Sequence, residues 1–205
     1  QGSHCQSPLF SRYRRQDPDM AINTQKLTVE AFWEQYAGQP YELVNGEIMA
    51  MPPAGMEASF IALQIGTYIN LFVMEHKLGW TTTADGGYML DNLNLRAPDV
   101  AFTSHERLPQ QQDFTKYGQV PPDLAVEVVS PNDSAGEVQH KVALYMEKGV
   151  TLVWVVYPKT RTVYVHRPDA DVKVLKDSDT LTGGDVLPGF TLSVRSIFPA
   201  PQSEA

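Results

Sequence analysis

Apolar residues recur at helical spacing in three parts of the chain. In residues 57–76 they form one broad stripe, made of Phe60, Ile61, Ile65, Tyr68, Ile69, Phe72 and Val73. Residues 133–149 repeat this spacing, and so does a shorter segment that follows Thr28, a plausible N-cap, and ends near Gly38. A stripe of this period is typical of helices that pack on other elements. The pattern therefore predicts three helices, of which 57–76 is the main packing helix.

Strand-like runs occupy much of the remaining chain. We predict strands over 80–90, 95–102, 123–130, 151–157, 162–167, 172–176 and 190–195. Residues 123–130 are almost wholly apolar, which indicates a strand buried on both faces. Asn45-Gly46 supports the positive φ angles of a tight hairpin that pairs Glu42 with Met49 and puts Glu42 and Glu47 on one face. Together these elements predict one α+β (α/β) domain with a central sheet, helices on its faces and β-hairpin additions.

Composition narrows the classes of protein. With 205 residues, of which 42% are apolar, the chain can bury one substantial core. Its net charge of −8 excludes a protein that coats nucleic acid through bulk charge, so a polyanion would have to be bound locally. The single cysteine, Cys5, excludes a disulfide framework and a cysteine-rich zinc site, and fits a cytoplasmic protein.

The ends of the chain and its apolar runs set further expectations. Residues 1–19 lack the apolar segment of a signal peptide, and we expect them to be a disordered tail or a cloning remnant. Residues 20–205 are expected to form a single domain. No uninterrupted apolar run approaches the roughly 18 residues of a membrane span, so no membrane contact is expected.

Two carboxylates lie within apolar strand-like segments. Glu127 shares a strand face with Ala125 and Val129, and an unpaired ionised group there would cost several kcal/mol. Its partner could be a cation from another element, in a purely structural ion pair or cap, or a metal ion. Asp99 lies in a second apolar segment, 97–102, where a Pro-Asp pair alone usually marks a turn. Two such carboxylates on neighbouring strands suit a hard divalent cation such as Mg²⁺ or Mn²⁺.

A lysine on the following helix could complete this site. Lys141 lies at the edge of the stripe formed by Val138, Val142, Tyr145 and Met146. From that position its ammonium could reach the end of the Glu127 strand and stabilise developing negative charge or help to position a water molecule. The alternative is a lysine that merely covers apolar surface.

Several segments resemble a known family. RAPDVAF, PPDLAVEVVSPND and HKVALYMEKGVTLVWVVYP, preceded by YELVNGEI, are similar to the Uma-type restriction endonuclease family, once classed as a domain of unknown function, in the PD-(D/E)XK nuclease superfamily. The resemblance covers about residues 26–198. It implies a restriction-endonuclease-like core with a mixed sheet and divalent-metal-dependent phosphodiester hydrolysis. It places Asp99 and Glu127 at the two acidic motif positions and Lys141 at the lysine position.

The sequence departs from the family pattern at two positions. The superfamily lysine would stand two residues after the acidic residue, where this chain has Val129, and relatives often carry a histidine where it has Ala58. Glu42 and Glu47 match acidic positions of the family's opening hairpin, and either could complete a metal site or simply face water. Glu57 is a weaker accessory candidate.

Basic residues gather near the C-terminal hairpin. They are Lys159, Arg161, Arg167, Lys173 and Lys176. This edge could contact phosphates, although a solvated charged hairpin is the more common arrangement.

Two hypotheses follow from these observations. The first is a Mg²⁺- or Mn²⁺-dependent endonuclease that acts on nucleic acid, with DNA favoured. The second is a nuclease fold retained as a weakly active or inactive binding or assembly module. We also predict a homodimer, with the aromatic strand of residues 152–157 as a possible interface.

Overall fold

The computed structural model describes residues 26–131 and 133–200, so the tail predicted for 1–19 lies outside the described residues. A six-stranded sheet forms its centre, in the order β10-β9-β8-β7-β6-β3. The strands are β3 Gly79–Thr83, β6 Val100–Ser104, β7 Leu124–Val128, β8 Leu152–Tyr157, β9 Thr162–His166 and β10 Lys173–Leu175. Only β7 and β8 pair in parallel, so this is the expected mixed sheet.

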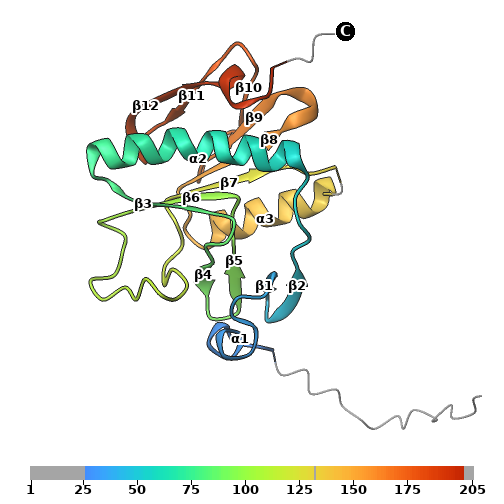
Figure 1. Ribbon diagram of the computed structural model, residues 1–205, viewed down its shortest axis with the longest axis vertical. Coiled ribbons are helices and arrows are strands. Elements are labelled where there is room, and N and C mark those ends of the chain that lie inside the picture. The colour runs from blue at the N-terminus through green and yellow to red at the C-terminus, as the bar shows by residue number, and fades with distance from the viewer. Residues whose placement is uncertain (1–25, 132, 201–205) are drawn as a thin grey trace, which may run out of the picture.

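Two helices cover the two faces of the central sheet (Figure 1). They are α2, Met56–His76, and α3, Ala135–Glu147. Because neighbouring residues of a strand point to opposite faces, Val126 packs in the core under α2 while Ala125 packs in the core under α3. Every residue of β7 is buried, which confirms the strand predicted to be buried on both faces. The same parity puts Glu127 on the α3 face.

One face of α2 does not pack as its sequence pattern predicts. Ile61, Ile65 and Ile69 are fully buried, but Phe60 and Tyr68, assigned above to the packing stripe, are 41% and 39% exposed. Apolar residues occur on every side of α2, so the apolar pattern alone did not identify the buried side. By length and composition alone α2 could also cross a membrane, although it contains no uninterrupted apolar run of the expected length. Of its most apolar stretch of 18 residues, 28% is buried inside the protein.

A smaller sheet and helix α1, Val29–Tyr36, lie at the lower end of the molecule in Figure 1. The sheet has the order β2-β1-β5-β4, with β1 Tyr41–Val44, β2 Glu47–Ala50, β4 Tyr88–Asp91 and β5 Asn94–Arg96. Thr28 caps α1, accepting a hydrogen bond from the Ala31 N–H, and Glu42 pairs with Met49 as predicted. Asn45 and Gly46 both have positive φ. The predicted hairpin and N-cap are therefore confirmed.

Two strand predictions are wrong in the same way. Residues 80–90 divide into β3 and β4, of which β4 belongs to the smaller sheet. Residues 95–102 divide into β5 and β6, of which β5 belongs to the smaller sheet. Pro98 explains the second division, because it has no N–H to continue a ladder between β5 and β6. Asp99 therefore stands immediately before β6, at the point where the chain passes from one sheet to the other.

The C-terminal segment adds a ribbon of β11, Thr180–Gly183, and β12, Leu187–Ser193, of which β11 was not predicted. The predicted hairpin of β8 and β9 is confirmed. β8 itself lies between β7 and β9, and Leu152 to Val156 are all buried. The suggestion that residues 152–157 form a dimer interface is therefore wrong.

Candidate active site

Glu127 is the central residue of the candidate site. It lies near the end of β7 on the face covered by α3, and it is 7% exposed. Lys141 Nζ donates to its Oε2 at 3.0 Å, and the Tyr145 hydroxyl donates to its Oε1 at 2.7 Å. Both carboxylate oxygens are thus held, and each keeps a second acceptor position.

Helix α3 supplies both of these donors. Ser134 and Glu137 form a capping box that fixes the first turn, since the Glu137 N–H donates to Ser134 Oγ and the Ser134 N–H donates to Glu137 Oε2. Lys141 and Tyr145 are four residues apart, so they lie one above the other on the same side of the helix. The start of α3 thereby sets which side chains reach Glu127.

Asp99 is the second carboxylate. The Val128 N–H donates to its Oδ2 at 2.7 Å, which ties Asp99 to the end of β7. Burial, and then the nearby charge of Glu127, raise the pKa of Asp99 to about 7. Asp99 makes no ion pair with any residue in the described part of the chain. Its negative charge is therefore poorly compensated.

Lys141 remains charged despite its partial burial. Burial opposes its positive charge, but the carboxylates of Glu127 and then Glu42 outweigh that effect and raise the pKa of Lys141 above its ordinary value. Glu42 thus lies close enough to influence Lys141. The structure brings together Asp99, Glu127 and Lys141, the three residues that the sequence assigned to catalysis.

Glu42 has a partner that sequence reasoning missed. Arg96 Nη1 donates to Glu42 Oε2 at 2.6 Å, the Ala97 N–H donates to Glu42 Oε1, and both side chains of the ion pair are 6% exposed. Glu47 and Glu57 are exposed and form no ion pair among the residues described. Of the three accessory candidates, only Glu42 is joined to the site.

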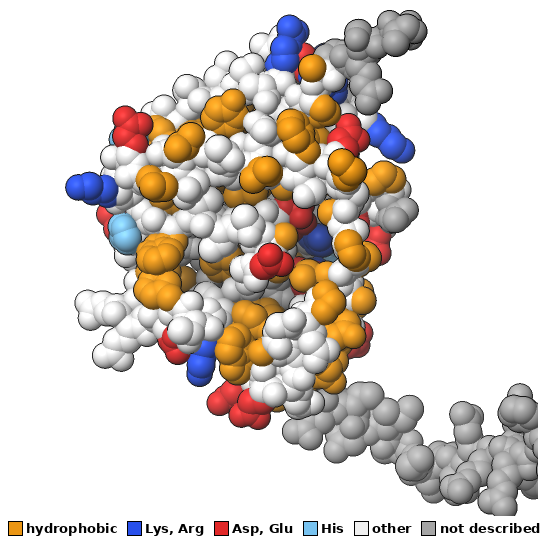
Figure 2. Space-filling view, viewed as in Figure 1, with side chains coloured by type: hydrophobic (Ala, Val, Ile, Leu, Met, Phe, Trp, Pro, Cys, Tyr) orange, Lys and Arg blue, Asp and Glu red, His pale blue; other side chains and the backbone are white. Residues whose placement is uncertain are grey.

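The site opens to solvent through a small recess. Its lining includes Glu127, Asp133, Glu137 and Lys141. On the face drawn in Figure 2, acidic and basic side chains lie together in a hollow between α2 and the β1–β2 hairpin. Asp133 also raises the pKa of Asp99, although burial and Glu127 contribute more. Sequence reasoning gave Tyr145, Arg96 and Asp133 no role in the site, because only the fold brings Tyr145 and Asp133 to Glu127 and Arg96 to Glu42.

The carboxylates suit a divalent cation. In the described part of the chain, no three His, Cys, Asp or Glu side chains are grouped to hold a metal ion. The two carboxylates Asp99 and Glu127 still offer hard oxygen ligands and an excess of negative charge. Mg²⁺ is commonly bound through one or two carboxylates and keeps several waters. The residues present therefore fit such an ion.

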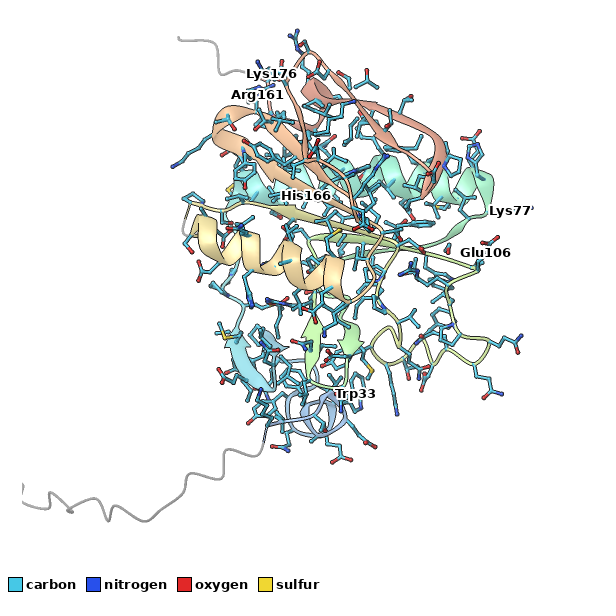
Figure 3. All side chains as sticks on the ribbon, turned by 180° about the vertical axis from the view of Figure 1, so that it is seen from behind. Trp33, Lys77, Glu106, Arg161, His166 and Lys176 are labelled. Atoms are coloured by element: carbon cyan, nitrogen blue, oxygen red, sulfur yellow. The ribbon has the colours of Figure 1, made fainter. Side chains whose placement is uncertain are left out.

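The basic residues of the C-terminal hairpin form two groups, not one edge. Arg161 precedes β9 and Arg167 follows it, so they lie at opposite ends of that strand. Arg161 and Lys176 lie close together in Figure 3, away from His166 at the other end of β9. Arg161 is already paired with Asp177 and stacks over Phe198. The five residues therefore do not gather at one place, and their contact with phosphates stays a prediction.

Comparisons with known proteins agree with this arrangement. The family model Uma2, described as "Putative restriction endonuclease", matches residues 29–195. The chain belongs to the Uma2 family. The crystal structure of "a putative nuclease belonging to DUF820" from Anabaena variabilis ATCC 29413 has a TM-score of 0.71 at 19% identity, covering 84% of this chain and 97% of that one. This likeness shows the restriction-endonuclease-like fold. The comparison with curated proteins gives no match.

Proposed function

We propose that this Uma2 protein is a divalent-metal-dependent endonuclease that hydrolyses phosphodiester bonds in nucleic acid, with DNA as its preferred substrate. The observation that carries the proposal is the juxtaposition of Asp99, Glu127 and Lys141 at one end of the central sheet. Family membership supports nuclease chemistry. The metal dependence, the substrate and the residue roles are our proposals.

In this proposal each side chain has a defined task. Asp99 and Glu127 would hold Mg²⁺ or Mn²⁺, which when bound supplies a Lewis acid for the phosphate and lowers the pKa of a bound water. Lys141 would lie beside the scissile phosphate and stabilise the negative charge that develops on it. Tyr145 would keep the Glu127 carboxylate in place through its hydrogen bond.

Four further predictions belong with this function. The group of Lys159, Arg161 and Lys176 lies at the same end of the sheet as Glu127, because Tyr157 pairs with Thr162 beyond the Val128–Val156 pair. We propose that the exposed members of this group contact substrate phosphates. We also propose that the protein acts as a homodimer in the cytoplasm and that residues 20–205 form a single domain.

The test is cleavage of single- and double-stranded DNA and RNA in the presence of Mg²⁺ or Mn²⁺. We expect Glu127→Ala and Asp99→Asn to lower the cleavage rate by about a thousandfold or more, a loss typical of essential active-site groups. Glu147→Gln is the matched control, since Glu147 is an exposed carboxylate at the far end of α3.

Two outcomes would contradict the proposal. Cleavage that survives Glu127→Ala unchanged would assign the activity to another site or to a contaminant. No cleavage of any of the four substrates, together with stable binding of nucleic acid or protein, would favour the alternative of a nuclease fold retained as a binding module.

A further inference from the structure

Helix α2 carries a second apolar stripe on the side that faces away from the sheet. Positions 56, 60, 63, 67, 70 and 74 alternate spacings of four and three residues, which is the heptad spacing of a helix–helix seam. Met56, Phe60, Leu63 and Met74 occupy four of these positions, and Leu71 flanks them. The core-facing residues Ala58, Ile61, Ile65, Ile69 and Val73 lie on the opposite side.

This outer stripe is strongly exposed. Met56 is 92% exposed, Leu63 62%, Leu71 60% and Met74 66%. Figure 2 shows hydrophobic side chains along the length of α2 on the face toward the viewer. Isolated apolar residues are ordinary on a protein surface, but exposed apolar residues that recur at heptad spacing along one helix are typical of a helix–helix interface.

Charge is confined to the ends of the helix. Between Ala58 and Met74 α2 has no ionisable side chain except the phenol of Tyr68. Glu57 stands in the first turn, and Glu75, His76 and the capping residue Lys77 stand at the last. A helix that faced only water would carry charged residues along its outer side.

We propose that the outer stripe of α2 is the interface of a homodimer in which the two α2 helices pack antiparallel. The stripe is complementary to itself, because a second copy supplies the same uncharged heptad seam. Pairing Met56 with Met74 of the other copy brings Leu63 next to Thr67 at the centre. Thr67 does not oppose this, because its hydroxyl already donates to the Leu63 carbonyl.

The helix dipoles favour the antiparallel arrangement, which opposes them. It sets both Glu75 and Lys77 of one copy near Glu57 of the other, so the side-chain charges at each end partly cancel. A parallel pair would bring Glu57 against Glu57 and Lys77 against Lys77. The seam, which is ~27 Å long at 1.5 Å per residue, would form the apolar centre of an interface for which about 800 Å² per partner is standard.

The first experiment measures the mass of the full chain in solution. Light scattering and sedimentation velocity at tens of micromolar should give a dimer for the wild type and a monomer for Leu63→Glu. Val172→Glu is the matched control, because it adds the same charge at an exposed apolar residue outside α2 and should remain dimeric. Circular dichroism and thermal unfolding show that each variant is folded.

The second experiment tests the orientation. In a Cys5→Ser background, Leu63→Cys should cross-link to itself through a short bis-maleimide, because the two sites lie ~6 Å apart along the seam. Met74→Cys alone should not, since the two residues would be ~27 Å apart along the axis. A mixture of Met56→Cys and Met74→Cys proteins should cross-link.

Each contrary result overturns the proposal in a recognisable way. A wild-type monomer at all concentrations, or a dimer that persists in Leu63→Glu, excludes this interface. Efficient self-cross-linking of Met74→Cys excludes the antiparallel arrangement. If the wild type is monomeric but sediments with vesicles of phosphatidylcholine and phosphatidylglycerol, and Leu63→Glu does not, the stripe is a membrane-binding surface instead. None of these outcomes depends on nuclease activity.

Discussion

Two buried glutamates, Glu42 and Glu127, each accept a hydrogen bond from a basic residue, yet their surroundings differ. Glu42 and Arg96 are both 6% exposed, and the second Glu42 oxygen accepts from the Ala97 N–H. At Glu127 the lysine partner is 30% exposed, and another carboxylate, Asp99, lies close by without a cation of its own. The Glu42–Arg96 pair is closed to solvent and electrically neutral. The Glu127–Lys141 pair is open to solvent, and together with an ionised Asp99 it carries a net negative charge.

This difference separates a structural ion pair from a candidate reactive one. Glu42 and Arg96 balance each other, so their burial needs no further ion. Asp99, Glu127 and Lys141 together leave one negative charge uncompensated when Asp99 is ionised. A proton on Asp99, whose pKa is raised to about 7, removes that excess, and a bound divalent cation would do the same.

The largest expected effect is a difference in the free energy of unfolding between a variant of the Glu42–Arg96 pair and one of the Glu127–Lys141 pair. Glu42→Gln leaves the Arg96 charge buried, with its Nε already lacking a partner among the described residues, and should lower the free energy of unfolding by about 3–5 kcal/mol. Glu127→Gln should cost less than about 2 kcal/mol, because Lys141 can turn to solvent and the repulsion of Asp99 disappears. Urea unfolding near neutral pH measures both.

Glu147→Gln serves again as the control and should lie within experimental error of the wild type, because its ion pair with Lys148 is at the surface. Equal losses for Glu42→Gln and Glu127→Gln would contradict the distinction between a closed and an open pair.

The next effect concerns Asp99 and pH. Its pKa is about 7 in the folded protein against an ordinary value of 3.8, so between these values the folded state binds more protons than the unfolded state. The stability of the metal-free protein should therefore fall as pH rises from about 4 to about 7, and then level off. Asp99→Asn should flatten this slope and raise the stability at about pH 8 by up to ~4 kcal/mol.

Chelator-treated protein and urea unfolding at several pH values provide the measurement. The asparagine amide oxygen can still accept from the Val128 N–H, so the variant tests the charge and not the hydrogen bond. A wild type that gains stability between pH 4 and 7 at the same rate as Asp99→Asn would contradict the raised pKa.

Local signals predicted the local structure well. The N-cap at Thr28, the turn at Asn45-Gly46 and the strand β7 each depend on a few adjacent residues, and all three are confirmed. The predictions failed where tertiary structure decides. Asp85-Gly86-Gly87 marks a turn within residues 80–90, but no local signal shows that β3 and β4 enter different sheets. α2 has apolar residues on every side, so the apolar pattern alone did not show that Phe60 is exposed.

The site shows the same limit. The sequence was enough to select Asp99, Glu127 and Lys141. A carboxylate in an apolar strand needs a partner, and the family resemblance indicates the two acidic positions and the lysine position. Tyr145 was assigned to the apolar stripe of α3, and only the structure shows its hydroxyl donating to Glu127. Arg96 could not be matched with Glu42, because the pair depends on how β1 and β5 associate. Partners across elements are set by topology.

A smaller effect tests the open pair with metal alone. Mn²⁺ at about one hundred times its dissociation constant should stabilise the protein by ~2.7 kcal/mol at about pH 8. The gain should shrink at about pH 5.5, where protons compete for Asp99, and should vanish in Asp99→Asn. Thermal unfolding with and without Mn²⁺ measures it. An equal gain in Asp99→Asn would assign the metal to other ligands.

The smallest expected effect is that of the hydroxyl that holds Glu127. Tyr145→Phe removes the 2.7 Å hydrogen bond to Oε1 and should lower the free energy of unfolding by ~1.5 kcal/mol. Because the carboxylate would lose its fixed orientation, Mn²⁺ affinity measured by calorimetry should also fall about tenfold. Tyr164→Phe, at a partly buried tyrosine on β9 that makes no side-chain hydrogen bond in the described region, should change neither quantity. Unchanged Mn²⁺ affinity in Tyr145→Phe would show that Lys141 alone is enough to orient Glu127.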